Sequence, residues 1–415
     1  MTKYNEKLLF KNTAMLYALQ FSSYLFSFIT VPYQTRILGP KIYGVIGVAV
    51  AIMAYFQLFL DFGFLLSATE DISKHRENKK YLSQKISSVA VIKFVFCIFS
   101  ISLVALFCIF FNPFKKYKIL YLLYIIAFCI NSLLPDYFFR GTENMTAITL
   151  RTVIVRFITT VFIFVFLKSP DDYLVIPALL ILGNAISVII AYFYIFKKAE
   201  VRFCRVKAKE IFLDLKHSFH FFLSRIATTV YSATNTVILG FVDKSGVLTG
   251  YYTSADKLVA TAKSGLSPIS DSIYPYMIKN KNFALIKKIL IFLEPVIILF
   301  CIIVGIFAKP LCVFVFGKSF ENTAPILIAL LPSVVAILPS YLLGFPTLSA
   351  MGLSGYANIS IYFGTVVHIL GLAFLFATDT LSAFSLAALT SLSEWSIMLF
   401  RAVTVYKNRQ LMRRT

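Results

Sequence analysis

Long apolar segments recur along the entire chain, and short polar turns separate them. Each segment holds about 20 mostly apolar residues, the length that a helix needs to cross roughly 30 Å of hydrocarbon. The pattern predicts an all-α polytopic membrane protein with about 12 transmembrane helices. Their apolar cores are residues 14–32, 45–68, 86–111, 119–137, 147–167, 173–196, 219–242, 251–278, 286–307, 323–345, 358–378 and 383–406.

Polar side chains recur at helical spacing inside several of these segments. Arg225, Thr229, Ser232 and Thr236 are 4, 3 and 4 residues apart in the seventh segment, and the eighth repeats the pattern. Positions at this spacing share one helical face. Ionisable groups at the middle of a span cost several kcal/mol unless they face protein or water. We therefore expect the seventh and eighth helices to line a wet cavity inside a helical bundle.

Composition agrees with a membrane protein. Hydrophobic residues make up 59% of the chain and charged residues 14%, and the mean hydropathy is +0.82. The net charge of +21 raises the alternative of a nucleic-acid partner, but the basic runs at 74–85, 197–216 and 407–414 each lie directly beside a span. Contact with anionic membrane lipids explains such runs. Lys and Arg concentrate on the side of the two termini, which predicts cytoplasmic termini.

A short internal echo suggests two related halves. The sequence ILG at 37–39, followed by GVIG at 44–47, returns as ILG at 238–240 and GVLTG at 246–250. Both copies fall between the first and second spans of a six-span half. This predicts two six-helix lobes related by a pseudo-two-fold axis along the membrane normal, with boundaries at 1–196 and 218–415 and a cytoplasmic linker at 197–217. Chance is the alternative for so short an echo.

Further polar groups inside the spans are candidates for function. Gln20 begins a polar stripe in the first span. Lys93 is near the cytoplasmic edge, and the alternative to a cavity position is that its side chain snorkels to the headgroups. Arg156 lies deeper in its span, where a cavity position is favoured. Five acids are candidates for proton or sodium coupling, because burial favours the protonated carboxyl: Asp61, Asp256, Asp271, Glu294 and Glu394. The alternative for Asp256 is that it neutralises Lys263, two turns further along the same stripe.

Other classes of protein fit poorly. The six cysteines form no C-x-x-C pair, which argues against a disulfide framework or a metal site. A membrane glycosyltransferase or polymerase needs a large outer loop with acid and base groups, whereas these outer loops are short, so we expect no enzyme. The pair His217 and His220 is only weakly suited to a metal, with Asp214 as the one nearby acid. Pro325, Pro332, Pro339 and Pro346 recur every seven residues and predict a bend in the tenth span.

Several stretches resemble the polysaccharide transporter family, the Wzx-type flippases of the multidrug/oligosaccharidyl-lipid/polysaccharide (MOP) superfamily. The matching stretches are VPYQTRILGPKIYG at 31–44, DFGF at 61–64, SAT at 67–69, PDYFFRG at 135–141, NTVILG at 235–240, GYYTSADK at 250–257 and LSPIS at 266–270. The likeness covers nearly the full chain. Asp256 stands where the family motif usually has Glu, which keeps the charge.

The resemblance implies a MATE-like fold that opens alternately to either membrane face. It also implies that the substrate is undecaprenyl pyrophosphate bearing an oligosaccharide and that the protein lies in the bacterial cytoplasmic (inner) membrane. The implied partners are a polysaccharide polymerase and a chain-length regulator, and no cofactor is expected. A pyrophosphate needs cations held in a cavity. The expected substrate-binding residues are Arg225, Lys257, Lys263, Arg156 and Lys93 for the phosphates, with Tyr231, Asn235 and Gln20 for sugar hydroxyls.

Two other transporter classes are the rivals. A multidrug or small-solute exporter on the same fold prefers acidic and aromatic cavity residues, whereas these spans are rich in Lys and Arg. A major facilitator transporter usually has a glycine-rich basic loop after its second span, and the loop at 71–80 contains no glycine.

Overall fold

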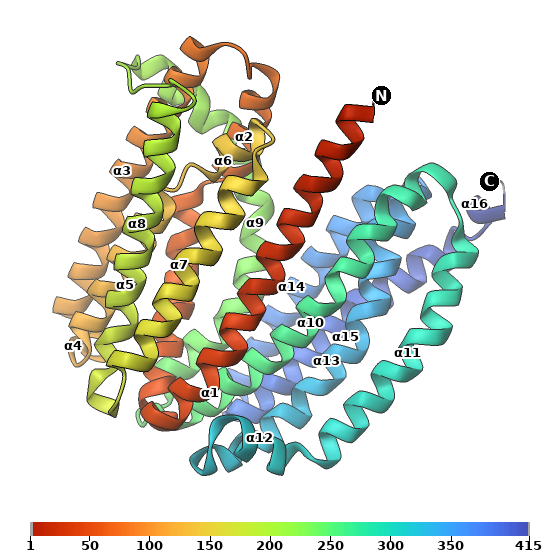
Figure 1. Ribbon diagram of the computed structural model, residues 1–415. Coiled ribbons are helices and arrows are strands. Elements are labelled where there is room, and N and C mark those ends of the chain that lie inside the picture. The colour runs from red at the N-terminus through yellow and green to blue at the C-terminus, as the bar shows by residue number, and fades with distance from the viewer. Residues whose placement is uncertain (1–2, 414–415) are drawn as a thin grey trace. The chain divides into compact units, whose positions relative to one another are not determined.

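The structure is a computed structural model that describes residues 3–413 (Figure 1). Side chains are described for residues 11–111, 114–223, 226 and 233–411. Every regular element in this part of the chain is helical, which confirms the all-α prediction.

The helices follow the apolar pattern closely. The first part of the chain forms α1 (Lys3–Asp61), α2 (Phe64–Lys74), α3 (Lys79–Phe110), α4 (Asn112–Lys115), α5 (Lys118–Ser132), α6 (Asp136–Gly141), α7 (Met145–Phe166), η1 (Pro170–Leu174), α8 (Val175–Lys197) and α9 (Ala208–Val242). The remainder forms α10 (Val247–Asn280), α11 (Phe283–Ile306), α12 (Ala308–Phe316), η2 (Lys318–Thr323), α13 (Ala324–Leu342), η3 (Leu343–Leu348), α14 (Ser354–Ala377), α15 (Ala383–Lys407) and α16 (Gln410–Arg413).

Each of the twelve predicted spans corresponds to a helical segment. Within the described residues, nine helical stretches are long and apolar enough to cross a membrane. One of them carries both the first and the second predicted span, because α1 continues through a break at Gly39, whose φ of 65° and ψ of 171° are not helical. Helices α9 and α10 cover the seventh and eighth predicted spans. They are less apolar because they carry the polar stripes.

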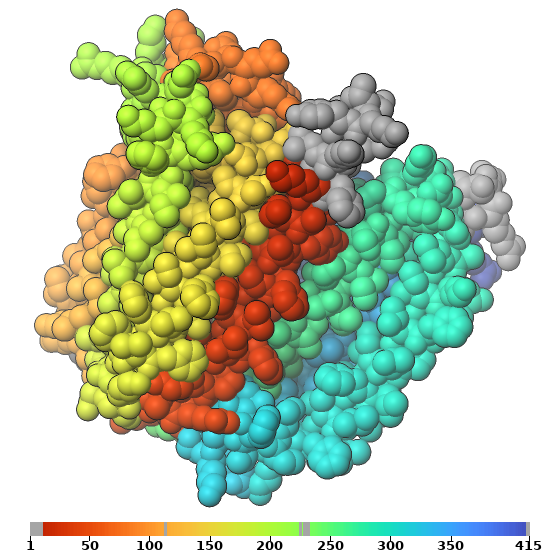
Figure 2. Space-filling view, in the orientation of Figure 1, coloured from red at the N-terminus to blue at the C-terminus, as the bar shows by residue number. Residues whose placement is uncertain are grey.

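Large apolar side chains cover much of the outer surface. On α11, Ile291, Phe292, Val296 and Phe300 are all more than half exposed, and this helix lies at the surface in the face shown in Figure 2. Exposed apolar area on this scale marks contact with a membrane. The protein is therefore a multi-pass membrane protein whose outer side chains face lipid.

The described helices group into two compact units. Unit 1 contains Met1–Leu38 and Ala49–Thr229, and unit 2 contains Gly39–Val48 and Val230–Thr415. A short piece of α1 thus belongs to unit 2. The lobe boundaries at 196 and 218 and the pseudo-two-fold axis stay predictions.

Close glycine contacts explain why this piece of α1 belongs to unit 2. A Cβ atom built on Gly44 would lie 2.0 Å from the backbone oxygen of Gly246, and one on Gly250 would lie 2.0 Å from the backbone oxygen of Pro40. Only residues without a side chain allow two backbones to approach this closely. The two glycine segments that echo each other in the sequence therefore pack directly against each other.

Unit 1 is built around an apolar core and a buried lysine. Phe64, Ile86, Tyr137 and Phe138 are almost fully buried in one cluster formed by α2, α3 and α6. Beside this cluster, Lys85 of α3 donates to Asp71 of α2 at 2.6 Å and to Asp214 of α9. Two acids around one buried cation fasten three helices together.

Candidate functional site

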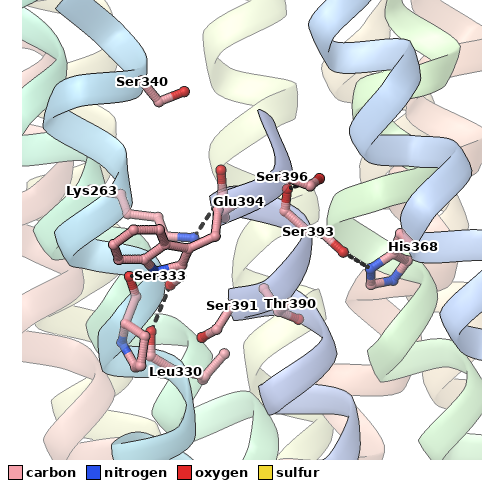
Figure 3. Close-up of polar contacts among 12 residues, drawn as sticks. Lys263, Leu330, Ser333, Ser340, His368, Thr390, Ser391, Ser393, Glu394 and Ser396 are labelled. Carbon is pink, nitrogen blue, oxygen red and sulfur yellow. Dashed lines mark hydrogen bonds and ion pairs between the residues drawn. The ribbon is translucent and has the colours of Figure 1, made fainter. Parts of the chain in front are cut away.

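An ion pair joins α10 and α15 in unit 2. Lys263 Nζ lies 2.8 Å from Glu394 Oε1, and the two side chains are only 16% and 9% exposed. Figure 3 shows the two groups facing each other on one side of α15. The alternative drawn from the sequence paired Lys263 with Asp256, on the same helix as Lys263. The ion pair that the structure places at Lys263 is instead made with an acid on another helix.

Asn235 is the centre of a buried polar network on the other side of α15. Its two Nδ2 hydrogens are shared among three acceptors, Thr390 Oγ1 at 2.8 Å, Tyr252 Oη at 3.0 Å and the Leu386 oxygen at 3.3 Å. Its Oδ1 lies 3.0 Å from His368 Nε2. The side chain is 3% exposed. Asn235 therefore connects α9 with α10, α14 and α15.

A buried arginine lies where the tenth span bends. Arg401 of α15 is 6% exposed and donates Nε to Ser360 Oγ at 2.8 Å, Nη1 to the Ser340 oxygen at 2.7 Å and Nη2 to the Ala357 oxygen at 3.3 Å. These acceptors are all neutral. The guanidinium charge is thus dispersed over hydroxyl and carbonyl dipoles of α13 and α14.

The bend itself is the π-helical turn η3 after α13. Gly344 has a ψ of −123°, which is not helical, and Pro346 lies inside the turn. Proline removes a backbone donor and π-turns interrupt the regular hydrogen-bond pattern, so carbonyl groups are left for other donors. Arg401 Nη1 adds a second donor to the Ser340 oxygen, which also accepts from the Leu343 backbone N–H at the end of α13. This bend confirms the one predicted from the proline spacing.

In unit 1, Lys93 is the predicted site residue with the deepest burial. It is 5% exposed, donates to the Ser132 oxygen, and its Nζ is 5.6 Å from the centre of the Tyr137 ring. The alternative that Lys93 snorkels to the headgroups is therefore wrong. Asp61, on the end of α1, accepts a hydrogen bond from Gln57 Nε2 at 2.8 Å.

The remaining predicted residues are less buried. Gln20, Arg156, Lys257 and Asp271 are exposed, and Gln20 donates to Tyr24 on its own helix. Asp256 and Glu294 are half-buried, and Glu294 Oε2 has no hydrogen-bond partner among the described residues. The side chains of Arg225 and Tyr231 lie outside the described residues. Of the predicted set, unit 2 thus gathers Lys263, Glu394 and Asn235 in buried polar contacts.

Residues outside the predicted set carry much of this polar interior. His368 is fully buried on α14, Arg401 is on α15, and in unit 1 Arg151 donates to Asp136 at 2.7 Å. Arg401 is near the end of its span, where a basic residue usually reaches the headgroups. The one signal for its burial is the series of serines on α13 and α14 that accept its hydrogen bonds.

Comparisons with known proteins extend along the chain. Residues 9–281 match the family model described as polysaccharide biosynthesis protein. The chain is 25% identical to a candidate O-antigen transporter of Escherichia coli (strain K12), over 79% of this chain and 80% of the relative. It is 27% identical to a candidate O-antigen transporter of Shigella dysenteriae, over 87% of this chain and 91% of the relative.

Solved structures agree in fold. The lipid II flippase MurJ in an inward closed conformation matches with a TM-score of 0.76 and 15% identity, over 95% of this chain and 87% of that one. An inward-facing multidrug resistance MATE family transporter of the MOP superfamily matches with a TM-score of 0.71 and 11% identity, over 94% of both chains. The named relatives are transporters and flippases, in agreement with the prediction that the chain is not an enzyme. With a family model that spans more than half of its length and a MATE-like fold, the chain belongs to the polysaccharide biosynthesis protein family.

Proposed function

We propose that the protein is a flippase for a lipid-linked oligosaccharide, with undecaprenyl pyrophosphate as the lipid carrier. It moves an O-antigen, capsule or exopolysaccharide repeat unit from the inner to the outer leaflet of the bacterial cytoplasmic membrane by alternating access, with both termini cytoplasmic. The observation that carries this proposal is the likeness to two candidate O-antigen transporters over most of the chain.

The chemistry of unit 2 supports an anionic headgroup. A pyrophosphate carries about two negative charges and many acceptor oxygens, so it competes well with a single carboxylate for a lysine. Lys263 is held by Glu394 at 2.8 Å and is still 16% exposed. The carboxylate keeps the ammonium group paired while no substrate is bound. A phosphate then replaces it without leaving either state with an uncompensated buried cation.

Further polar groups in the spans are candidates for binding the sugar and for coupling transport to a proton or sodium ion. Gln20 is exposed on α1 and offers an amide to sugar hydroxyls. Proton or sodium coupling through Asp61, Asp256, Asp271, Glu294 or Glu394 remains part of the proposal, as do a polymerase and a chain-length regulator as partners. The polyprenyl tail stays in lipid, beside the exposed apolar side chains.

The test is a deletion strain complemented with the wild-type gene or with Lys263→Ala. The wild-type gene should restore surface polysaccharide. Lys263→Ala should not, and lipid-linked repeat units should then accumulate on the inner leaflet. The matched control is Lys309→Ala, because Lys309 pairs with Glu321 in the same unit but at the surface, with 67% and 49% of the two side chains exposed. A deletion that changes drug sensitivity and strands no glycolipid would instead support a multidrug or small-solute exporter.

A further inference from the structure

His368 is a fully buried histidine inside unit 2. Its side chain is 0% exposed, and both ring nitrogens have hydrogen-bond partners: Nε2 is 3.0 Å from Asn235 Oδ1 and Nδ1 is 3.0 Å from Ser393 Oγ. Histidine is the side chain whose ordinary titration falls in the physiological range. The hydrogen bonds to Asn235 and Ser393 constrain which ring nitrogens carry a proton.

The orientation of Asn235 determines the state of Nε2. The amide end of Asn235 that faces the Leu386 oxygen must be the NH2 group, because a carbonyl oxygen can only accept. The opposite end, Oδ1, is an acceptor and faces His368. The Nε2 atom of His368 therefore carries a hydrogen whenever it is bonded to Asn235 Oδ1.

Ser393 leaves two states open for Nδ1. Its single hydroxyl hydrogen has two acceptors within reach, the Leu389 oxygen at 2.8 Å and His368 Nδ1 at 3.0 Å. When the hydroxyl donates to His368, the ring is neutral. When it donates to Leu389, the contact with His368 is a hydrogen bond only if Nδ1 also carries a hydrogen, and the ring is then an imidazolium. The two states differ by one proton and by one hydroxyl rotation.

We propose that His368 is a proton-binding site of unit 2, which takes up a second ring proton as the Ser393 hydroxyl turns to Leu389. The imidazolium then has an acceptor on each side, Asn235 Oδ1 and Ser393 Oγ. A buried charge needs such hydrogen bonds to offset its loss of water. No carboxylate is required in direct contact, so this site is additional to the five acids expected from the sequence.

The charged groups near the site connect it to substrate binding. Glu394 and Arg401 come from α15, which packs along α14. Lys263, Tyr252 and Asp256 come from α10, and Asp256 interacts electrostatically with Tyr252. Ser393 and Glu394 are consecutive, and Figure 3 shows them on opposite sides of α15, facing His368 and Lys263. If the proposed function holds, a phosphate that takes Lys263 leaves the Glu394 charge unpaired, and this negative charge stabilises the imidazolium.

The direct test is nitrogen NMR of the purified full-length protein with ¹⁵N-labelled histidine. The chain has four histidines, and the signals of His368 are those that disappear in His368→Gln. His75→Gln is the control, because His75 is exposed and its loss leaves the His368 signals in place. We expect one protonated and one bare ring nitrogen at neutral pH, and two protonated nitrogens only on acidification below about pH 6, since a buried ring becomes charged less readily than a solvated one.

Two serine variants separate the proposed site from any other buried histidine. Ser393→Ala removes the hydrogen bond at Nδ1 in both states, and the bond to the charged ring is the stronger of the two. The midpoint of His368 in this variant should therefore require up to about tenfold more protons than in wild type. Ser393→Thr keeps the hydroxyl and should keep the midpoint. A ring that stays in one state over this range, or a midpoint that is equal in wild type and Ser393→Ala, overturns the proposal.

Transport is measured separately. In proteoliposomes, wild type should change its rate of glycolipid transfer with pH over the range in which His368 titrates, and His368→Gln should lose this dependence. If His368 titrates and the pH dependence persists in His368→Gln, the link to transport is wrong. If wild type transfers no glycolipid and His368 titrates as described, the proposed function fails and the proton site stands.

Discussion

Lys263 and Glu394 meet across α10 and α15, 131 positions apart in the chain, with 2.8 Å between Nζ and Oε1. Their side chains are only 16% and 9% exposed, so each depends on the other for a counter-charge. If a residue both binds substrate and stabilises the fold, loss of transport in a single variant has two explanations. The first prediction is designed to separate these two effects.

Lys263→Ala should destabilise the protein as well as stop transport. Removing one partner of a buried ion pair costs about 3–5 kcal/mol, because the remaining charge is unpaired. The double variant Lys263→Met with Glu394→Gln removes both charges and should recover most of this loss in unfolding measurements in detergent. It should still fail to deliver glycolipid. A double variant with normal transport would remove this pair from the substrate site.

Gly250→Ala should prevent the assembly of unit 2. The added Cβ would lie 2.0 Å from the Pro40 oxygen and 2.7 Å from the Pro40 carbonyl carbon, and backbone atoms cannot move aside as a side chain can. The matched control is Gly265→Ala on the same helix, where the Cβ meets nothing within 4 Å. We expect loss of folded protein in size-exclusion chromatography for the first variant. The control should be unchanged or slightly more stable, since alanine favours helix. Equal behaviour of the two would contradict the packing described above.

Arg401→Lys should lower stability although it keeps the charge. A lysine ammonium is a point charge on a flexible stem and cannot reproduce the fork that reaches Ser360, Ser340 and Ala357 together. Leaving one or two of these buried acceptors without a donor costs about 1–3 kcal/mol each. The control is Arg409→Lys, because Arg409 is exposed near the end of the chain. Thermal unfolding of both variants beside wild type checks the difference, and an unchanged Arg401→Lys would contradict it.

Asp243 should make the stability of unit 2 dependent on pH in the acidic range. Its carboxylate accepts hydrogen bonds from Ser245 N and Oγ and from Thr249 N and Oγ1, at 2.6 to 3.1 Å. Burial alone would raise the pKa of Asp243, but the hydrogen bonds outweigh it and hold this pKa below its ordinary value. The stabilisation is thus complete above the ordinary pKa of about 3.9 and is lost as the pH falls through the lowered value.

Comparison with Asp243→Asn isolates this contribution. At neutral pH wild type should be more stable than the variant, since an amide accepts at one end only. The difference should shrink below about pH 4, where the aspartate becomes protonated. Asp171→Asn, at an exposed position in unit 1, is the control. A difference that does not vary with pH would show that the carboxylate charge has no part in fastening this turn.

The apolar pattern predicted the helices well because bilayer thickness alone sets the length of a span. The polar stripes were less informative. Asn235 and Lys263 are in buried contacts as expected, yet Lys257 and Asp271 are exposed although they lie on a predicted interior face. Periodicity identifies a face of a helix but does not say which neighbour covers it.

The spacing of residues along one helix could not predict contacts with side chains on distant helices. The stripe on α10 suggested Asp256 for Lys263 because both residues lie on one helix, whereas Glu394 reaches Lys263 from α15. Arg401 and His368 were missed, since the spacing of a single ionisable residue in a span does not show whether serines or lipid headgroups contact it. Only the packing of α13 and α14 against α15 brings their acceptors together.

The segment Gly39–Val48 is part of unit 2 although unit 1 surrounds it in the chain. During translation this segment is made before the rest of unit 2. The turn at Gly246, which contacts Gly44, is made only after α3 to α9. Unit 2 can therefore assemble only when its early segment packs against helices that are synthesised much later. A gene divided at the linker would accordingly yield a second half that lacks one of its own pieces, and only co-expression of both fragments would supply it.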